Sequence, residues 1–368
     1  MRVAICVNHF HPSVGGSEYV TKRIAEHIAK SHKVYVFTRM VRGRRADDIK
    51  GYQVFSYRHR DASGFLGKLK SVKPDVVLIY SDMFDFYRQV LSGTLKTRLI
   101  VALCGANWAH SHPAYSRLFL SLAHNIDHLI CHSECERDYS MCSQSFLRDK
   151  TVLIPNGIDL SDFDSNIKTR EALLPKCSDK QWIINVSNFF PGKGQEHCIE
   201  ILRLLANKEK ISFIQISNDI EFPIGEKLKN SWRLKATREL KQRGIDFHMM
   251  SNLPREDVVG FFKNANAFLF PSVKEVAPIV LLESMASRTP WVCMDVGNAK
   301  ELSGGFCVKA VKDHQFQAMV DSRVIRTMAA YTDRALGEPH LGDVGRLHVE
   351  REFMWDKILQ LYSNLLER

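Results

Sequence analysis

Two glutamates in one segment form the clearest chemical pattern in this 368-residue sequence. Glu275 and Glu283 lie eight positions apart in FPSVKEVAPIVLLESMASRTPW, and only apolar residues separate them. A buried helix is expected to begin near Val280, so the two carboxylates bracket its first turns. Free backbone N–H groups at a helix N-terminus favour an anion such as a diphosphate, and a carboxylate about two turns on could accept hydrogen bonds from ribose hydroxyls. From spacing alone, a capping glutamate followed by a solvent-facing one explains the pattern equally well.

The elements that must position these glutamates form a regular alternation of strands and helices. A helix over Glu18–Ser31 is expected, with Val20, Ile24, Ala25 and Ile28 on its buried stripe. Parallel strands joined by crossover helices produce this α/β pattern, so two successive Rossmann-like doubly wound sheets are predicted. The expected strands are 3–7, 33–38, 76–80, 99–103, 128–132 and 152–154 in the first half, and 182–186, 213–217, 245–249, 267–270 and 291–294 in the second.

The domain boundary is expected in PNGIDLSDFDSN, whose Pro, Gly, Asp and Ser residues indicate a loop. This places one domain over residues 1–164 and another over 165–352. The last segment, EREFMWDKILQLYSNLLER, predicts an amphipathic helix over about 353–368. Its expected apolar stripe comprises Phe353, Ile358, Leu361, Tyr362 and Leu365.

The charge and composition limit the class of protein. Lys and Arg outnumber Asp and Glu by 51 to 41, a net charge of +10, while 45% of the residues are hydrophobic. Such a chain buries a sizeable core, which excludes a disordered, collagen-like or coiled-coil protein. The basic excess points to an acidic partner. It is concentrated at residues 33–73, including Arg42, Arg44 and Arg45, where the alternatives are a solvated loop surface and a face for an anionic membrane or acceptor.

The cysteines and the apolar runs bear on the cellular compartment of the protein. Nine cysteines at irregular spacing are expected to be reduced, and five are expected in buried strands: Cys6, Cys104, Cys131, Cys293 and Cys307. No apolar stretch reaches the roughly 18 residues of a membrane-spanning helix. A cytoplasmic protein is therefore expected, with peripheral attachment to the inner face of the plasma membrane as a further expectation.

Several segments in a fixed order resemble the signature of retaining GT-B glycosyltransferases, family 4 in particular. They are the pair Glu-x7-Glu in PSVKEVAPIVLLESMA, HPSVGGSE after the first strand, IPNGIDLSDF between domains, SNFFPGKGQE and DVGNAKEL. The resemblance covers nearly the whole chain. It implies two Rossmann-like domains, with the acceptor bound by the first, the nucleotide sugar by the second, and the last helix crossing back to the first domain.

The resemblance also assigns roles in the second domain. Glu283 matches the residue that holds the ribose, and Glu275 the one near the hydroxyls of the transferred sugar. The amides of Ile279 and Val280 would meet the diphosphate. Lys193 would stabilise the negative charge that develops on the leaving diphosphate.

Outside these residues the resemblance is less complete. Gly15 and Gly16 match a glycine loop that lets the backbone approach the donor. Asn188 stands where the family has an Arg of the diphosphate site, so Arg255, Lys274 or Arg288 is a candidate replacement. Base and sugar discrimination is expected near Ser217, Met250 and Asn252.

The first domain departs from the family at a sugar-contacting histidine. The matching position is Cys104, and Asn107, His110 and His112 follow. His110 is the candidate catalytic histidine, against the alternative of a surface loop residue. No carboxylate is identified as a nucleophile, so the resemblance implies front-face attack, in which the acceptor hydroxyl gives its proton to the leaving diphosphate.

Three competing patterns are weaker. PGKGQE lacks the G-x4-G-K-[ST] spacing of a P-loop. Asp162-Phe163-Asp164 has the form of a metal-binding D-x-D motif but lies in the interdomain segment, and is interpreted as loop acidity. Cys131, His132, Cys135 and Cys142 have poor spacing for zinc. No metal, no other cofactor and no nucleic-acid partner are therefore expected.

The sequence thus predicts a retaining hexosyltransferase. It would move a hexose from a nucleotide diphosphate sugar, UDP ahead of GDP, to a cell-surface glycan or lipid-linked saccharide. Polysaccharide or lipopolysaccharide biosynthesis is the expected setting. A GT-B-fold sugar-nucleotide epimerase and a non-catalytic nucleotide-sugar-binding pseudoenzyme remain as alternatives.

Overall fold

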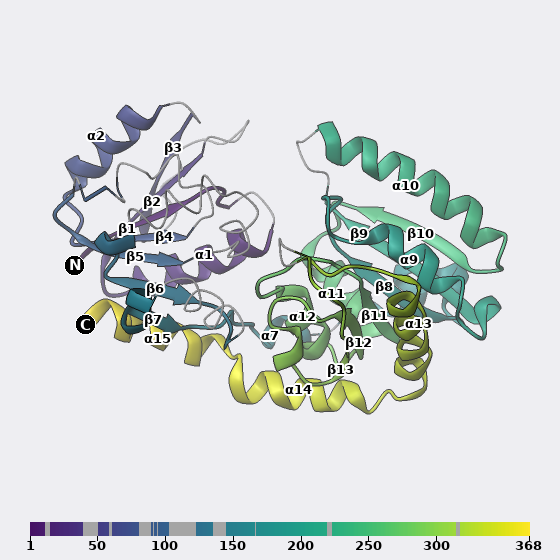
Figure 1. Ribbon diagram of the computed structural model, residues 1–368. Coiled ribbons are helices and arrows are strands. Elements are labelled where there is room, and N and C mark those ends of the chain that lie inside the picture. The colour runs from purple at the N-terminus through teal and green to yellow at the C-terminus, as the bar shows by residue number, and fades with distance from the viewer. Residues whose placement is uncertain are drawn as a thin grey trace. The chain divides into compact units, whose positions relative to one another are not determined.

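The chain forms two compact units, each built around one parallel sheet (Figure 1). The structure is a computed structural model that describes residues 1–11, 15–39, 51–58, 61–80, 90, 92–93, 95–102, 123–134, 145–165, 167–218, 223–313 and 317–368. One unit comprises Met1–Asn156 with Asp356–Arg368, and the other comprises Gly157–Trp355. The second unit therefore includes residues 157–164, which the sequence analysis placed in the first domain.

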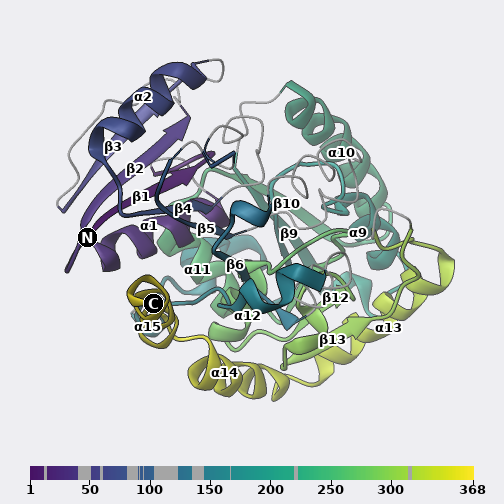
Figure 2. The same ribbon diagram turned by 60° about the vertical axis from the view of Figure 1, so that its left-hand side comes forward.

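Among the described residues, the first unit has a seven-stranded sheet in the order β3-β2-β1-β4-β5-β6-β7 (Figure 2). Every neighbouring pair is parallel. Its elements are β1 (Arg2–Val7), α1 (Gly16–Ile28), β2 (Lys33–Arg39), β3 (Tyr52–Tyr57), α2 (Ala62–Val72), β4 (Val76–Tyr80), β5 (Arg98–Ala102), η1 (Ala123–Asn125), β6 (His128–Cys131), η2 (Ser145–Lys150), β7 (Thr151–Leu153) and, from Asp356 on, α15 (Trp355–Glu367).

The described part of the second unit has six parallel strands in the order β10-β9-β8-β11-β12-β13. Its strands are β8 (Gln181–Val186), β9 (Ile211–Ser217), β10 (Asp246–Ser251), β11 (Ala267–Phe270), β12 (Trp291–Met294) and β13 (Gly305–Val308). Its helices are α7 (Ser161–Asp164), α8 (Arg170–Leu173), η3 (Pro175–Cys177), α9 (Gln195–Leu202), η4 (Lys208–Lys210), α10 (Pro223–Lys241), α11 (Arg255–Asn264), α12 (Ile279–Ala286), η5 (Ala299–Glu301), α13 (Ser322–Gly337) and α14 (Leu341–Glu352).

Both faces of the second sheet are buried, because alternate side chains of its strands point into two different cores. Ile183 packs with α9, α10 and α13 on one face. Trp182 and Ile184 pack with α11, α12 and α14 on the other. This explains why the central strands are almost continuously apolar in sequence.

Each sheet has one point where the direction of winding reverses. In the first unit β1 lies between β2 and β4, and in the second β8 lies between β9 and β11. The loops that follow the two strands at such a point diverge to opposite faces and leave a crevice at the carboxyl edge. Ligands of open α/β sheets bind at that place.

The structure confirms the predicted α/β fold class and the predicted positions of most strands. The buried stripe of α1 consists of Val20, Ile24, Ala25 and Ile28, as expected, together with Thr21. Two strands, β3 and β13, had no expected bounds, although Cys307 of β13 was expected in a strand. Within the described residues, no helix combines the length and apolar character needed to cross a bilayer.

The C-terminal segment differs from its prediction in detail. Phe353 follows α14 and packs in the second unit, where the Ile158 amide donates to its carbonyl at 2.8 Å and Met354 forms an isolated parallel bridge with Ile158. Within α15 the buried stripe also includes Leu359, and Leu361 at its margin is 40% exposed. Ile358, Tyr362 and Leu365 are buried as predicted.

The last helix, yellow in Figure 1, belongs to the first unit. The Oγ of Ser363 lies 2.8 Å from Nε2 of His27 on α1. The Arg98 guanidinium at the start of β5 donates to the carbonyl of Leu366. The chain therefore returns to the unit in which it began.

Candidate functional site

The loop after β8 is held against the loop after β11 by a glycine. Gly194 has φ +71°, in the left-handed region that favours glycine. A Cβ added there would lie 1.8 Å from the carbonyl oxygen of Pro271. This close approach of two backbones places Lys193 directly beside the segment that follows β11. The PGKGQE pattern therefore has a structural reason independent of any ligand.

Lys193 and Glu275 meet at the point where the second sheet reverses its winding. The Nζ of Lys193 lies 2.7 Å from Oε1 of Glu275. Ser272 donates to the same oxygen at 2.6 Å, and its residue is fully buried. The Glu275 side chain is 10% exposed and that of Lys193 is 33% exposed. The pair is therefore partly shielded from water, with the ammonium on the more open side.

Helix α12 begins directly after this pair and carries no negative charge of its own at its start. Its first turn has no acidic residue, and Pro278 provides no capping side chain. The first amides of a helix have no partner within the helix, so the N–H groups of Ile279 and Val280 are donors for an external acceptor. Gly297 lets the loop after β12 pack on this segment, because a Cβ there would lie 2.3 Å from the Val276 carbonyl oxygen.

Glu283 lies further along α12 and is held by an arginine that sequence reasoning could not place. Arg255, the first residue of α11, forms an ion pair with Oε1 of Glu283. The Glu283 side chain is 10% exposed and that of Arg255 is 42% exposed. Arg255 also lies over the ring of Phe163, 5.5 Å from its centroid. Both predicted glutamates thus have a cationic partner and neither faces open solvent.

Asn188, at the position of the missing arginine, forms hydrogen bonds between two loops. The Oδ1 of Asn188 accepts a hydrogen bond of 2.8 Å from the amide of Asn218, just after β9. Its carbonyl accepts another from Nε2 of Gln195 at 2.9 Å. Asn188 therefore ties together the loops after β8 and β9, and its side-chain oxygen is already engaged with protein.

The three candidate replacements for that arginine differ in their position relative to the two glutamates and in their charged partners. Arg255 lies at the site through Glu283. Arg288 lies beyond the C-terminal end of α12 and pairs with Asp343 of α14. Burial lowers the pKa of Lys274, with Asp313 acting in the opposite direction. Of the three, Arg255 alone is paired with one of the two glutamates.

The residues expected to discriminate base and sugar lie at the carboxyl ends of β9 and β10. The amide of Asn252 donates to the Ser217 carbonyl at 3.0 Å, and Asn252 has φ +55°. The Ser217 hydroxyl is buried and has no hydrogen-bond partner among the described residues. Oδ1 of Asn298, in the loop after β12, is likewise buried and has no hydrogen-bond partner among the described residues. Asn298 was not singled out from the sequence, where the segment DVGNAKEL carried only its resemblance.

The first unit provides fewer described residues at its corresponding edge. Gly15 has an extended backbone that any residue adopts, and Gly16 begins α1. Among the described residues, a Cβ on Gly15 would meet only the end of the flexible Glu18 side chain and no backbone. His110, with Cys104, Asn107 and His112, lies outside the described residues, as do Arg42, Arg44 and Arg45.

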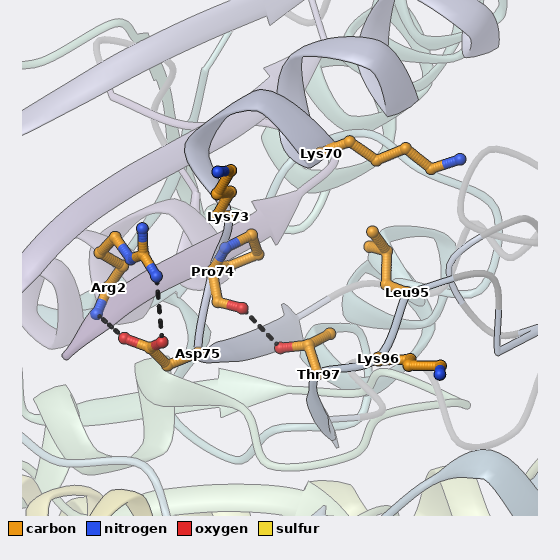
Figure 3. Close-up of a pocket in the computed structure, with 8 residues that line it drawn as sticks. All are labelled: Arg2, Lys70, Lys73, Pro74, Asp75, Leu95, Lys96 and Thr97. Carbon is orange, nitrogen blue, oxygen red and sulfur yellow. Dashed lines mark hydrogen bonds and ion pairs between the residues drawn. The ribbon is translucent and has the colours of Figure 1, made fainter.

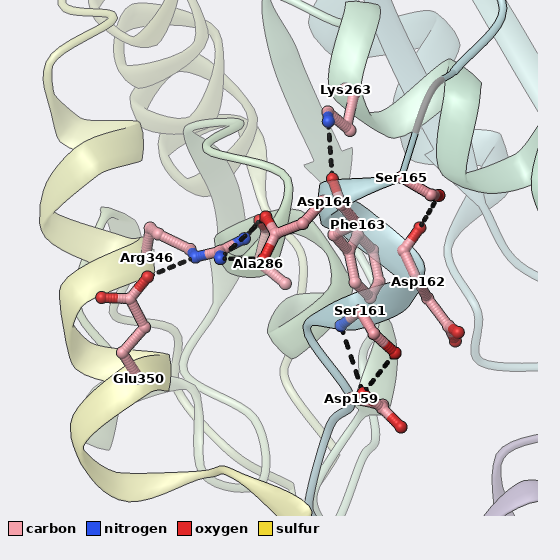
Figure 4. Close-up of polar contacts among 10 residues, drawn as sticks. All are labelled: Asp159, Ser161, Asp162, Phe163, Asp164, Ser165, Lys263, Ala286, Arg346 and Glu350. Carbon is pink, nitrogen blue, oxygen red and sulfur yellow. Dashed lines mark hydrogen bonds and ion pairs between the residues drawn. The ribbon is translucent and has the colours of Figure 1, made fainter.

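The D-x-D segment has a structural role (Figure 4). Both carboxylate oxygens of Asp164 accept hydrogen bonds of 2.9 Å from Arg346. Arg346, whose side chain is 7% exposed, also donates to Glu350 and to the Ala286 carbonyl. Phe163 is fully buried. This arrangement joins α7, α12 and α14, and both oxygens of the Asp164 carboxylate are engaged by Arg346.

A basic pocket of about 330 Å³ lies at the opposite edge of the first sheet (Figure 3). Its lining residues include Arg2, Lys73 and Lys96. Asp75 accepts hydrogen bonds from the amide and guanidinium of Arg2. Arg2 and Asp75 lie at the amino ends of β1 and β4, so the pocket is at the edge away from the expected crevice.

The described cysteines fit the expectation of free thiols. Cys6, Cys131 and Cys293 are free and buried, whereas Cys307 is only partly buried. Cys104 lies outside the described residues, as do Cys135 and Cys142 of the poorly spaced zinc grouping. His132 of that grouping is buried and bonds to the Ile154 carbonyl.

Two family models match the chain, one for each half. The model described as Glycosyltransferase Family 4 matches residues 14–162. The model described as Glycosyl transferases group 1 matches residues 168–322, which include both glutamates and Lys193.

Curated relatives include a putative teichuronic acid biosynthesis glycosyltransferase TuaC of Bacillus subtilis, 26% identical over 199 residues. Another is a processive diacylglycerol alpha-glucosyltransferase of Acholeplasma laidlawii, 26% identical over 157 residues. The alignments cover 53% and 42% of this chain, and they span 44% of the length of each relative.

Solved structures similar to the whole chain include sucrose-phosphate synthase from Thermosynechococcus elongatus, with a TM-score of 0.80 at 17% identity, covering 100% of this chain and 99% of that one. Anabaena HepE in complex with UDP gives a TM-score of 0.75 at 16% identity and covers 100% of both chains. At this level of identity the likeness concerns the fold. Together with the two family models, it shows that the chain belongs to the group 1 glycosyltransferases of the GT-B fold.

Proposed function

We propose that this glycosyltransferase is a retaining hexosyltransferase whose second unit binds a nucleotide diphosphate sugar. The observation that carries the proposal is the Lys193–Glu275 pair, 2.7 Å long, at the start of an uncapped helix. A diphosphate needs cations and free N–H donors, and a sugar needs carboxylates that accept hydroxyl hydrogen bonds. Both kinds of group meet at the switch point of the sheet, where this fold class binds ligands.

In this proposal each charged side chain exchanges a protein partner for a part of the donor. Lys193 turns from Glu275 to the diphosphate, which leaves the Glu275 carboxylate for the sugar hydroxyls. Glu283 accepts hydrogen bonds from the ribose, and Arg255 supplies the cation that the arginine missing at Asn188 would have supplied. The amides of Ile279 and Val280 bind diphosphate oxygens.

The transfer itself follows from where charge develops. The bond between the anomeric carbon and the diphosphate breaks, and the diphosphate takes up negative charge that Lys193 and the helix N-terminus stabilise. The acceptor hydroxyl attacks from the same face and gives its proton to the leaving diphosphate oxygen. Retention follows because the new bond forms on the face that the old one leaves. We propose no metal in this step and no other cofactor.

The names of the relatives support the choice of acceptor, and the UDP complex of HepE supports the choice of donor. One relative is named an alpha-glucosyltransferase, and formation of an alpha product from an alpha-linked nucleotide sugar is retention. One relative is named for teichuronic acid biosynthesis and the other for diacylglycerol, a saccharide polymer and a lipid. We therefore propose a UDP-sugar as donor and a cell-surface glycan or lipid-linked saccharide as acceptor. A cytoplasmic protein that docks peripherally on an anionic membrane through residues 33–73 fits this acceptor.

The test is a thermal-shift screen of nucleotide sugars followed by transfer to a lipid or saccharide acceptor. A ligand at 100 times its Kd stabilises the fold by about 2.7 kcal/mol, so the true donor should stand out. The anomeric configuration of the product, read by NMR, decides between retention and inversion. Glu283→Gln should raise the donor KM with the fold intact, and unchanged donor kinetics would remove Glu283 from the site.

The two alternatives predict different products. An epimerase would convert the nucleotide sugar with no acceptor present. A pseudoenzyme would bind the nucleotide sugar in calorimetry and transfer to no acceptor in an extract. Transfer with release of the nucleotide diphosphate excludes both.

A further inference from the structure

A second cluster of chemically active side chains lies at the edge of the second sheet. It consists of Cys177 in η3 and of Asp246 and His248 in β10. One ligand atom from each of the three residues lies within 4.8 Å of the others. Because β10 is the outermost strand in the order β10-β9-β8-β11-β12-β13, this cluster is separate from the loops after β8 and β11.

Local structure brings the three side chains to one face. Asp246 and His248 are two apart on a strand, so they point the same way. Cys177 reaches them because its carbonyl accepts a 2.7 Å hydrogen bond from Nε1 of the buried Trp182, at the start of β8. The Cys177 residue is 3% exposed, whereas the Asp246 side chain is 41% exposed. The cluster thus has a buried sulfur and an open carboxylate.

The distances are close to those of ligands around one ion. The Sγ of Cys177 lies 3.2 Å from Nε2 of His248 and 3.4 Å from Oδ2 of Asp246. Zinc bonds of about 2.3 Å to sulfur and about 2.0–2.2 Å to nitrogen or oxygen, in a tetrahedron, separate sulfur from such an atom by about 3.5–3.7 Å, so the cluster would widen by a few tenths of an ångström around an ion. Sulfur, imidazole nitrogen and carboxylate oxygen are also the donor set that zinc prefers.

A buried hydroxyl also lies beside the cluster. Ser212 on β9 is fully buried and pairs in register with Asp246. Burial raises the pKa of the Cys177 thiol, and the neighbouring Ser212 side chain lowers it. Metals bind the thiolate, so the Cys177 thiol would lose its proton when the ion binds.

We propose that Cys177, Asp246 and His248 form a Zn²⁺ site, with water as the fourth ligand on the exposed side. The ion pins the segment that leads into β8 onto the edge strand β10. It would cover part of an otherwise open sheet edge. Its role is structural, and the proposed transfer reaction does not pass through it.

One residue opposes the ion in the metal-free state. Lys180 Nζ lies 2.8 Å from Oδ2 of Asp246 and lowers the pKa of that carboxyl. Zinc would take the place of this ammonium on the carboxylate, and Lys180, at the sheet edge, would turn to solvent. Removal of Lys180 should therefore tighten zinc binding, a direction that a merely structural hydrogen-bonded cluster does not predict.

The experiment titrates purified, chelator-treated full chain with Zn²⁺ and counts bound zinc by mass spectrometry and calorimetry, with no nucleotide sugar present. We expect one tight zinc per chain, lost in Cys177→Ala and in His248→Ala. Cys307→Ala on β13, the opposite edge of the same sheet, is the matched thiol control, and the exposed His340→Ala is the imidazole control. Both should keep the zinc. Co²⁺ in place of Zn²⁺ should give a thiolate charge-transfer band that vanishes in Cys177→Ala.

Two further variants separate loss of zinc binding from misfolding and test the predicted effect of Lys180. Asp246→Asn changes a half-exposed residue and should weaken zinc binding at least tenfold with an unchanged circular dichroism spectrum. Lys180→Met should tighten it several-fold. Zinc at 100 times its Kd should favour the folded state about 100-fold, or about 2.7 kcal/mol, in the parent only. Absence of zinc from the parent, or unchanged zinc in both Cys177→Ala and His248→Ala, would overturn the proposal.

Discussion

The two units share one topology but differ in how they prepare the helices at their carboxyl edges. In the first unit, α1 starts with a carboxylate of its own, because Glu18 lies in the first turn and accepts a 2.8 Å hydrogen bond from the Ser17 hydroxyl. In the second unit, α12 has no acidic residue in its first turn and no capping side chain. Its glutamates lie on either side of the helix start instead, each paired with a cation.

This difference teaches which of these helix starts is prepared for an anion. A helix N-terminus carries roughly half a positive charge, which Glu18 partly neutralises in α1. At α12 that charge remains for a ligand, and Lys193 adds another. The start of α9, which follows β8 as α1 follows β1, also has a first-turn carboxylate, Glu196, so α12 differs from both.

The largest expected effect comes from the cation of the second unit. Lys193→Ala should lower kcat by about 10²–10³, or about 3–4 kcal/mol, because a charge that stabilises the leaving diphosphate is lost. Lys193→Arg should recover part of the activity. Steady-state kinetics measure this, with the exposed Lys241→Ala on α10 as the control. A loss below tenfold would mean that another cation carries the diphosphate.

A second prediction concerns acid and the first unit. Burial lowers the pKa of His132 to about 4 from an ordinary value of 6.5, while its bond to the Ile154 carbonyl acts the other way. Between these values the unfolded chain binds a proton that the folded chain does not. The His132 contribution to stability is therefore complete above pH 6.5 and is lost as the pH falls toward 4, by about 3 kcal/mol.

His132→Gln should flatten this part of the pH dependence of the free energy of unfolding. The exposed His124→Gln should leave it unchanged. Hydrogen exchange followed by mass spectrometry should show the acid-induced opening in residues 1–156 before residues 157–355. An identical pH profile in the parent and His132→Gln would refute the buried-histidine explanation.

The sequence predicted the elements that depend on local pattern. Apolar β-branched runs predicted most of the strands, and the apolar residues from Ile279 to Leu282 predicted the buried helix. The approach of Lys193 to Glu275 could be expected only through resemblance, since 82 residues separate them. Physically it depends on Gly194 and Pro271, and no local pattern reports that contact.

What the sequence could not supply was pairing across the fold. Arg255 and Glu283 are 28 positions apart on different helices, and the partner of Arg346 is 182 positions away. The predicted stripe of the last helix was wrong at Leu361, because the buried stripe is centred nearer to Leu359 and Leu366 and leaves Leu361 at its margin. The Cys177 and His248 cluster escaped notice for the same reason, with 71 positions between its members.

A smaller effect should test the charge at the start of α12. Ile279→Glu places a carboxylate in its first turn, which imitates Glu18 of α1. It should weaken donor binding about tenfold, through loss of about 1.4 kcal/mol of attraction for the diphosphate. Ile279→Gln has a similar size and no charge, so it isolates the electrostatic part. Equal donor Kd values for the two variants would show that the helix start does not bind the anion.

The smallest expected effect tests whether the two units unfold together or separately. Gly67 lies within α2 of the first unit and Gly337 at the end of α13 of the second, and an added Cβ at either meets nothing within 4 Å. Each Gly→Ala change should therefore stabilise its helix, by about 0.5–1 kcal/mol for Gly67 and less for the terminal Gly337. If the units unfold separately, hydrogen exchange slows only in the unit that carries the change, because a two-domain chain need not unfold in one step. Slower exchange throughout the chain in both variants would instead show that the two sheets, despite their different helix starts, unfold as one cooperative body.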